Sequence, residues 1–261
     1  MGINVTNRNL YIISIMLVLL ANILVPINTF ADEGSNNTAE QSSVPHNGMV
    51  EPGYKPSPQE VEWHMKKEKD LKEFLEETYG VKYFRILPLE REWREPDDWE
   101  HRNYCGPGAT QVALDARLLA EYVPDINTIG VMENIDPNWG VYMNDVKDTL
   151  NNILSSYDDI PNINGFVGYV LGYPSSSDEL QNKILWDIMK GYATISGVYT
   201  QGMPGWSRSA YHIVAVFGVS GDYYKYAETS SPTAGYTGPF SQWVLKDDFY
   251  QWYTANSVIS W

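Results

Sequence analysis

Cys105 is the single cysteine among 261 residues, and it lies in the segment Asn103-Tyr-Cys-Gly-Pro-Gly-Ala109. A lone thiol cannot form a disulfide within its own chain, so it is a free thiol, part of an intermolecular crosslink or a reactive group that does chemistry. The apolar residues Val112, Leu114 and Leu118 that follow indicate a helix. At a helix N-terminus, unpaired N–H groups and the positive end of the dipole lower the pKa of a thiol, which favours the nucleophilic thiolate.

The turn around the thiol consists of small and rigid residues. Gly106 and Gly108 carry no side chain, so we expect them to leave room for a substrate backbone beside Cys105. Pro107 fixes the backbone between them.

A thiolate nucleophile needs a general base, and the chain offers four histidines. His46 falls in a polar segment, His64 in a highly charged one, and His101 in a loop without a rigid seat. His212 stands at the start of an apolar, strand-like run that ends at Gly218. It is either a hydrogen-bonded core histidine or the base, and the free cysteine favours the base.

Glu228 is the candidate for the third member of such a site. Residues Ser220-Gly-Asp222 are a hairpin-turn signal between the strand of His212 and a second strand, 223–229. Glu228 can then lie beside His212 across the ladder. A carboxylate there would fix the tautomer of the imidazole and stabilise its charged form.

Four ordered segments resemble the C39-like peptidases, which are bacterial cysteine peptidases with a papain-like fold. The segments are 104–109 around the thiol, 140–150 as a second helix, 188–195 at the entry to a strand, and 211–218 around His212. Each segment is weakly specific alone, and their joint order and spacing are more so.

The resemblance implies a catalytic triad in which Cys105 is the nucleophile, His212 is the base and then the acid, and Glu228 orients the ring. Two positions depart from the family pattern. The family usually has Asp in the third position, and Glu228 is one methylene longer. The glutamine that many members carry six residues before the cysteine is Trp99 here, so Asn103, assisted by the backbone N–H of Cys105, is our candidate for the oxyanion donor.

The elements that must position these residues are helices first and strands afterwards. We expect helices at 57–79, 106–122, 143–155, 177–190 and 246–253, and strands at 81–87, 192–200, 210–219, 223–229 and 257–261. This order predicts an α+β fold, in which N-terminal helices pack on a C-terminal antiparallel sheet. The resemblance implies that this fold is papain-like.

Residues 1–31 have the features of a signal peptide. Arg8 precedes an apolar run that stops at Pro26, and Ala31 precedes the expected cleavage point. The run is short for a comfortable transmembrane helix, which needs about 20 apolar residues. We therefore expect a protein that is secreted or held in the cell envelope, and contact with a membrane only if the segment is retained as an anchor.

Three further parts follow the expected signal. Residues 32–56 are polar and predict a flexible linker. Residues 57–80 predict a charged helix that begins at a capping box of Ser57 and Glu60, and this helix is a docked part of the domain, a spacer or a detachable pro-segment. Residues 81–261 form the expected C39-like peptidase domain.

The formal net charge of −15 argues against nucleic acid and anionic membranes as partners. The segment from Asp125 to Asp136 begins like a calcium loop, but Ile129 stands at its fifth position, so we reject calcium. No phosphate loop or cysteine pair with metal spacing is present in the sequence. We expect neither a metal nor a cofactor.

The chemistry around Cys105 predicts a secreted cysteine peptidase or amidohydrolase that acts on a peptide or protein through an acyl-enzyme. A transglutaminase-like acyltransferase would use the same thiol. A non-catalytic binding module on the same fold is the alternative from another class. The loop 202–207 before the strand of His212 is either a lid or a surface connection.

Overall fold

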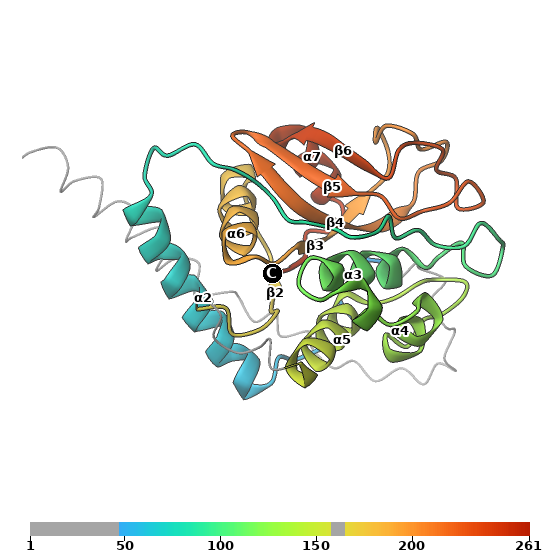
Figure 1. The fold of residues 1–261 in the computed structure, drawn as a ribbon, viewed down its shortest axis with the longest axis horizontal. Coiled ribbons are helices and arrows are strands. Elements are labelled where there is room, and N and C mark those ends of the chain that lie inside the picture. The colour runs from blue at the N-terminus through green and yellow to red at the C-terminus, as the bar shows by residue number, and fades with distance from the viewer. Residues whose placement is uncertain (1–46, 158–164) are drawn as a thin grey trace, which may run out of the picture. The chain divides into compact units, whose positions relative to one another are not determined.

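The part of the chain that the structure describes, residues 47–157 and 165–261 of a computed structural model, is built around an antiparallel sheet (Figure 1). The strand order is β2-β7-β3-β4-β5-β6, and β1 pairs with β4. The strands are β1 (Phe84–Ile86), β2 (Leu171–Gly172), β3 (Thr194–Tyr199), β4 (Tyr211–Ser220), β5 (Tyr223–Ala227), β6 (Ser241–Leu245) and β7 (Ile259–Ser260). Helices precede most of the sheet along the chain, which confirms the expected mixture of helices and antiparallel sheet.

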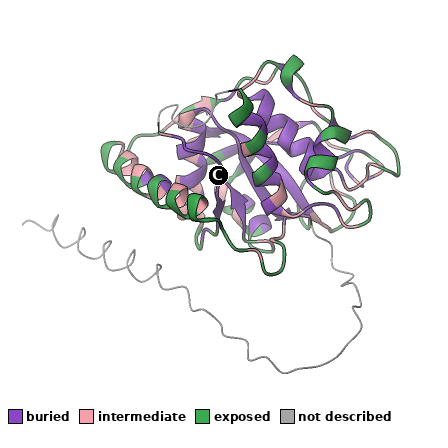
Figure 2. Ribbon diagram, turned by 90° about the horizontal axis from the view of Figure 1, so that it is seen from below, coloured by how far each residue is buried: buried purple, intermediate pink, exposed green. Residues whose placement is uncertain are grey.

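The hairpin of β4 and β5 leads to the end of the sheet where the candidate site lies, and its register shifts by one residue between Val216 and Gly218. β4 is buried from His212 to Val219, and buried residues lie both in the strands and in the helices beside them (Figure 2). Gly221 stands in the turn with φ +56°, a conformation that glycine adopts without a steric penalty. Ala215 pairs with Ala227.

Six α-helices stand in the described part of the chain. They are α2 (Pro58–Glu77), α3 (Cys105–Asp115), α4 (Ile126–Met132), α5 (Met143–Ser156), α6 (Ser177–Lys190) and α7 (Lys246–Tyr253). Every residue of α3 is buried, because this helix packs on β3 and β4 and also contacts α4 and α5. The capping box of Ser57 and Glu60 is present at α2, and Gly191 closes α6 in the left-handed conformation, both as the sequence predicts.

Four elements differ from the expectation, among them strand β2, which the residue patterns did not indicate. α3 ends at Asp115 rather than near residue 122, and Leu119 and Tyr122 beyond it are 54% and 48% exposed. A continued helix would therefore have had little surface to pack against. α4 and β6 are additional elements that the residue patterns did not indicate.

Helix α2 is docked on the rest of the domain through a fully buried lysine. The ammonium of Lys67 lies 3.6 Å from a carboxylate oxygen of Asp187 in α6 and 3.9 Å from the ring centroid of Phe166. It also donates a hydrogen bond to the carbonyl of Gly168 at 3.1 Å. Helix α2 thus packs on the domain through a buried ion pair.

The end of the expected linker is bound to the domain. The backbone N–H of Glu51 donates to the side chain of Asn144 at 3.0 Å, and the carbonyl of Met49 accepts from Met143 at 2.7 Å. Asn47 is buried, and its side-chain oxygen accepts from Val141. The expectation of a flexible linker is therefore wrong for this stretch, because its polar groups pair with α5 and the turn before it. Residues 1–46, which include the expected signal peptide, lie outside the described residues.

Candidate active site

Cys105 is the first residue of α3, as the sequence predicts. Tyr104 precedes the helix and makes no side-chain hydrogen bond to cap it. The N–H groups of Cys105 and Gly106 precede the first hydrogen bond of the helix, which Gly108 donates to Tyr104, and Pro107 has no N–H. Cys105 is 2% exposed, which places the thiol in an environment with little water.

The two glycines beside the thiol have a different function from the expected one. A Cβ atom on Gly106 would lie 2.2 Å from Val141, and one on Gly108 would lie 2.6 Å from Thr229. Both glycines are buried against the protein's own side chains. They allow α3 to approach its neighbours closely, and the expectation that they leave room for a substrate backbone is wrong.

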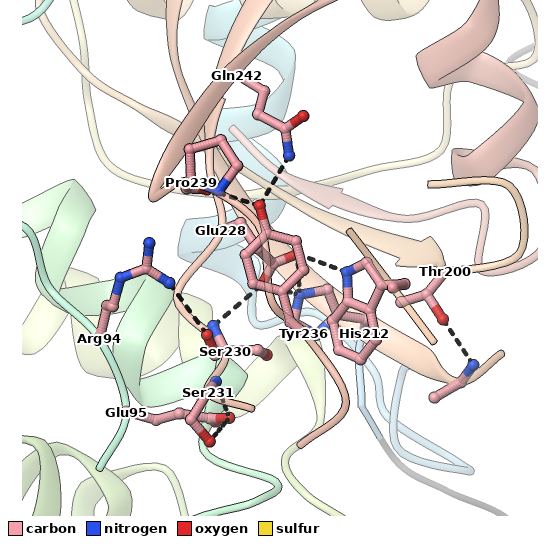
Figure 3. Close-up of polar contacts among 12 residues, drawn as sticks. Arg94, Glu95, Thr200, His212, Glu228, Ser230, Ser231, Tyr236, Pro239 and Gln242 are labelled. Carbon is pink, nitrogen blue, oxygen red and sulfur yellow. Dashed lines mark hydrogen bonds and ion pairs between the residues drawn. The ribbon is translucent and has the colours of Figure 1, made fainter. Parts of the chain in front are cut away.

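His212 is the second residue of β4 and pairs with Val198 of β3. Its ring is buried, and Nε2 lies 2.8 Å from Oε1 and 3.0 Å from Oε2 of Glu228 (Figure 3). Cys105 is close enough to the same ring to help raise its pKa. Because Nε2 faces the carboxylate, Nδ1 is the nitrogen left for the thiol. The structure thus brings together the three residues that the sequence singles out.

The register of the hairpin explains how a glutamate reaches His212. The last pair of the β4–β5 ladder joins Ala227 to Ala215. One more step along both strands sets Glu228 beside Val214, which is two residues from His212 and on the same face. A side chain has to reach diagonally across the ladder from this position, and the additional methylene of glutamate suits that reach.

Glu228 is buried and held by two donors besides His212. The backbone N–H of Ser230 donates to Oε1 at 3.0 Å, and the indole N–H of Trp206 donates to Oε2 at 2.9 Å. The Trp206 ring also meets the imidazole at a centroid distance of 4.7 Å. Each carboxylate oxygen therefore has a fixed partner, which restricts the rotation of a side chain longer than aspartate.

The electrostatics of the pair favour its charged form. Burial opposes a charge on His212, but the Glu228 carboxylate, the charge of Cys105 and hydrogen bonds to both raise the pKa of the ring to about 10. Burial likewise opposes a charge on Glu228, and the neighbouring His212 together with the donated hydrogen bonds holds the pKa of that carboxyl below its usual value. An imidazolium and a carboxylate are the states that this geometry stabilises.

The other expected residues lie around the start of α3. The side-chain amide of Asn103 donates to the carbonyl of Pro137 at 2.7 Å, which uses one of its two N–H groups. Trp99 is 69% exposed and stacks against Arg102. His101 has a firm seat, contrary to expectation, because its ring nitrogens lie 2.8 Å from Asp98 and 2.9 Å from Asn127.

Two residues near the triad were not assigned from the sequence. Trp206 lies in the loop 202–207, whose Gly- and Pro-rich composition gave the only signal. Glu95 lies in a Pro- and Trp-containing loop that gave none, yet it is buried beside Ser231, close enough to interact electrostatically with His212 and Glu228 (Figure 3). A buried acid is found only once the chain is folded.

The loop 202–207 is tied to the segment that follows β5. Ser207 donates to the carbonyl of Gly235 through its backbone at 3.0 Å, and Thr237 donates to the carbonyl of Gly205 at 3.0 Å. Together with the Trp206 contact to Glu228, these bonds make the loop a part of the site's wall. This arrangement fits a fixed surface connection better than a freely opening lid.

Comparison with protein-family models finds no match, and comparison with curated proteins finds none either. Among solved structures, one similar chain is a protein from Bacillus anthracis that is provisionally described as a C39-like peptidase. The identity is 12% and the TM-score 0.43, over 68% of this chain and 96% of the other. A similarity this distant carries no argument about activity, so the case for a function depends on the residues of the site.

No helix within residues 47–157 and 165–261 is both long and apolar enough to cross a membrane. Over the same residues, His, Cys, Asp and Glu side chains form no group of three that could hold a metal ion.

Proposed function

We propose that this protein is a cysteine peptidase or amidohydrolase of the C39-like type with a papain-like fold. In this proposal Cys105 is the nucleophile, His212 is the base and then the acid, and Glu228 orients the ring. The observation that carries the proposal is the buried imidazole of His212, whose Nε2 lies 2.8 Å from Glu228 and whose pKa is raised by both Glu228 and Cys105.

The reaction follows from these positions. The Cys105 sulfur, its proton held by His212, forms a bond to the carbonyl carbon of an amide. The C–N bond then breaks, and the imidazolium gives its proton to the leaving amine. Water attacks the resulting thioester, loses a proton to His212 and releases the carboxylic acid, while the sulfur regains a proton. Glu228 stabilises the imidazolium in both steps.

The developing oxyanion needs donors at the start of α3. The backbone N–H of Cys105 and the second N–H of the Asn103 amide are the groups we propose, since the first N–H of Asn103 is bound to Pro137. Replacing Asn103 by Ala should slow acylation and leave alkylation of the thiol unchanged, because alkylation forms no oxyanion.

The substrate class that fits this chemistry is a peptide or protein, and we propose an extracellular or cell-envelope site of action on the strength of residues 1–31 alone. An acyltransferase with the same thioester would differ only in its acceptor. Cleavage of a peptide library by the wild type and by Cys105→Ala, with and without an added primary amine, separates hydrolysis from transfer.

The test of the proposal is the reactivity of Cys105, which gives a clean readout because the chain has one cysteine. We expect iodoacetamide to alkylate it at pH 6 faster than it alkylates a cysteine peptide, and His212→Ala to remove that advantage. His101→Ala is the matched control, since this ring is bound to Asp98 and Asn127. Alkylation no faster than that of the peptide, and unchanged in His212→Ala, would overturn the proposal.

One observation favours a second candidate, a non-catalytic binding module. Cys105 is only 2% exposed, and many buried cysteines are unreactive. The same alkylation experiment discriminates the two, because a thiol that serves only for packing reacts slowly in the wild type and in both histidine variants.

A further inference from the structure

Glu95 is a second buried acid beside the triad, and the proposed reaction does not use it. Its side chain is 3% exposed. Oε1 accepts hydrogen bonds from Ser231, at 2.9 Å from the backbone N–H and 3.3 Å from the hydroxyl. Oε2 is buried and has no hydrogen-bond partner among the described residues. Burying a carboxyl oxygen without a hydrogen bond destabilises the folded state, so we expect this carboxyl to contribute to the site.

The backbone around Glu95 fixes this carboxyl to the segment that carries Glu228. The N–H of Glu95 donates to the carbonyl of Thr229 at 2.8 Å, and the guanidinium of Arg94 donates to the carbonyl of Ser230 at 3.3 Å. The loop of Glu95 thus runs alongside residues 229–231. These bonds hold Glu95 beside the segment that begins with Glu228.

Three charged groups face Glu95 or neighbour it in the chain. His212 in β4 attracts its carboxylate and Glu228 after β5 repels it. Arg94, the preceding residue, directs its guanidinium to the backbone carbonyls of Ser230 and Gly238. The chain therefore gives Glu95 one favourable charge in the site, the imidazolium of His212.

We infer that Glu95 is a positioning residue that acts through His212: its carboxylate, fixed by Ser231 beside the His212–Glu228 pair, stabilises the imidazolium that the nucleophile needs as its counter-ion. This inference rests on the proposed function. Glu228 provides the direct contact, and Glu95 adds a second negative charge in a buried medium, where charges interact more strongly than in water. Linkage is reciprocal, so a charged His212 must also favour the charged form of Glu95.

Protonation makes this contribution dependent on pH. Burial raises the pKa of Glu95 to about 7, against the hydrogen bonds from Ser231 and the charge of His212. Below this pH, Glu95 is neutral and Glu228 alone supports the imidazolium. Above it, both carboxylates do, and the ring keeps its proton to a higher pH.

The experiment is an NMR titration of the full chain labelled with ¹³C-histidine, in which the His212 signal is assigned from His212→Asn. Glu95→Gln removes the charge but keeps an oxygen to accept from Ser231. We expect the midpoint of the His212 titration to fall by about one pH unit in this variant, the lower end of the effect of a nearby charge. Glu90→Gln is the matched control, because Glu90 lies in the same loop and its exposed carboxylate binds Ala120 instead.

The result that overturns the inference is an unchanged His212 midpoint in a folded Glu95→Gln protein. If that variant does not fold, the wild type is used instead. Its His212 chemical shift, followed against pH, must then show a small second step near pH 7. A single step would contradict the inference. Alkylation of Cys105 in the same samples reports on the proposed function separately. A slow thiol together with a lowered His212 midpoint would refute the peptidase and leave the coupling between Glu95 and His212 intact.

Discussion

The indole N–H of Trp206 donates a hydrogen bond to Oε2 of Glu228 at 2.9 Å. The same ring packs edge-on against His212, with the centroids 4.7 Å apart. One side chain thus contacts both the base and the acid of the proposed triad. Because its loop is hydrogen-bonded to residues 235–237, Trp206 brings a rigid donor to a carboxylate that has one more torsion than aspartate.

Replacing Trp206 by Phe keeps most of the packing and removes the donor. A hydrogen bond to a charged acceptor contributes about 1.5–3 kcal/mol, so we expect the rate of Cys105 alkylation or of peptide cleavage to fall by about ten- to a hundredfold. Trp243→Phe is the control, since Trp243 is 41% exposed on β6. Equal rates in the two variants would show that the indole N–H does not hold Glu228 for the reaction.

Replacing Glu228 by Asp tests whether the site is built for the longer acid. The shorter side chain withdraws the carboxylate from the diagonal reach to His212 and from the Trp206 donor, and we expect at least a tenfold loss in kcat/KM. Glu228→Gln should lose more, about 10³- to 10⁴-fold, because the charge that stabilises the imidazolium is gone. An aspartate variant as active as the wild type would mean that the strand register does not favour glutamate over aspartate at position 228.

Local patterns predicted much of the fold and the three central residues of the candidate site. The helix start at Cys105 and the hairpin around Gly221 follow from capping and turn preferences, which act over a few residues. The hairpin turn alone does not explain the proximity of His212 to Glu228, because its register would place Glu228 opposite Ala215. The irregularity between Val216 and Gly218 shifts the pairing by one residue and brings Glu228 to the face of His212.

The rest depends on contacts between distant segments. Glu95 meets Ser231 across 136 residues, and Lys67 meets Gly168 across 101. No local preference marks either residue, since an acid in a loop and a lysine in a charged helix normally face water. The polar composition of residues 47–51 predicts a linker for the same reason, because their partners in α5 are visible only in the folded chain.

Because of the His212–Glu228 pair, we expect the free energy of unfolding to depend on pH. The folded-state pKa of His212 is raised to about 10, so the pair's contribution is complete below the ring's ordinary pKa near 6.5 and is lost as the pH rises toward 10. The pKa of Glu228 is lowered, so the contribution is also lost when the pH falls through that lowered value. The difference in urea midpoint between the wild type and His212→Gln should therefore be largest near pH 6 and shrink by pH 10. His101→Gln is the control, and a difference that grows with pH would contradict the assignment.

We expect the buried pair of Lys67 and Asp187 to contribute strongly to the docking of α2. Replacing it by Ala leaves the carboxylate of Asp187 buried without its cation, and removal of one partner of a buried pair costs about 3–5 kcal/mol. Lys69→Ala is the matched control in the same helix, because Lys69 is 74% exposed and its pairing with Glu73 contributes little. Urea unfolding should separate the two variants clearly. If Lys67→Ala were no less stable than Lys69→Ala, α2 would be held by its other contacts, and the buried ammonium would not be the anchor of the helix.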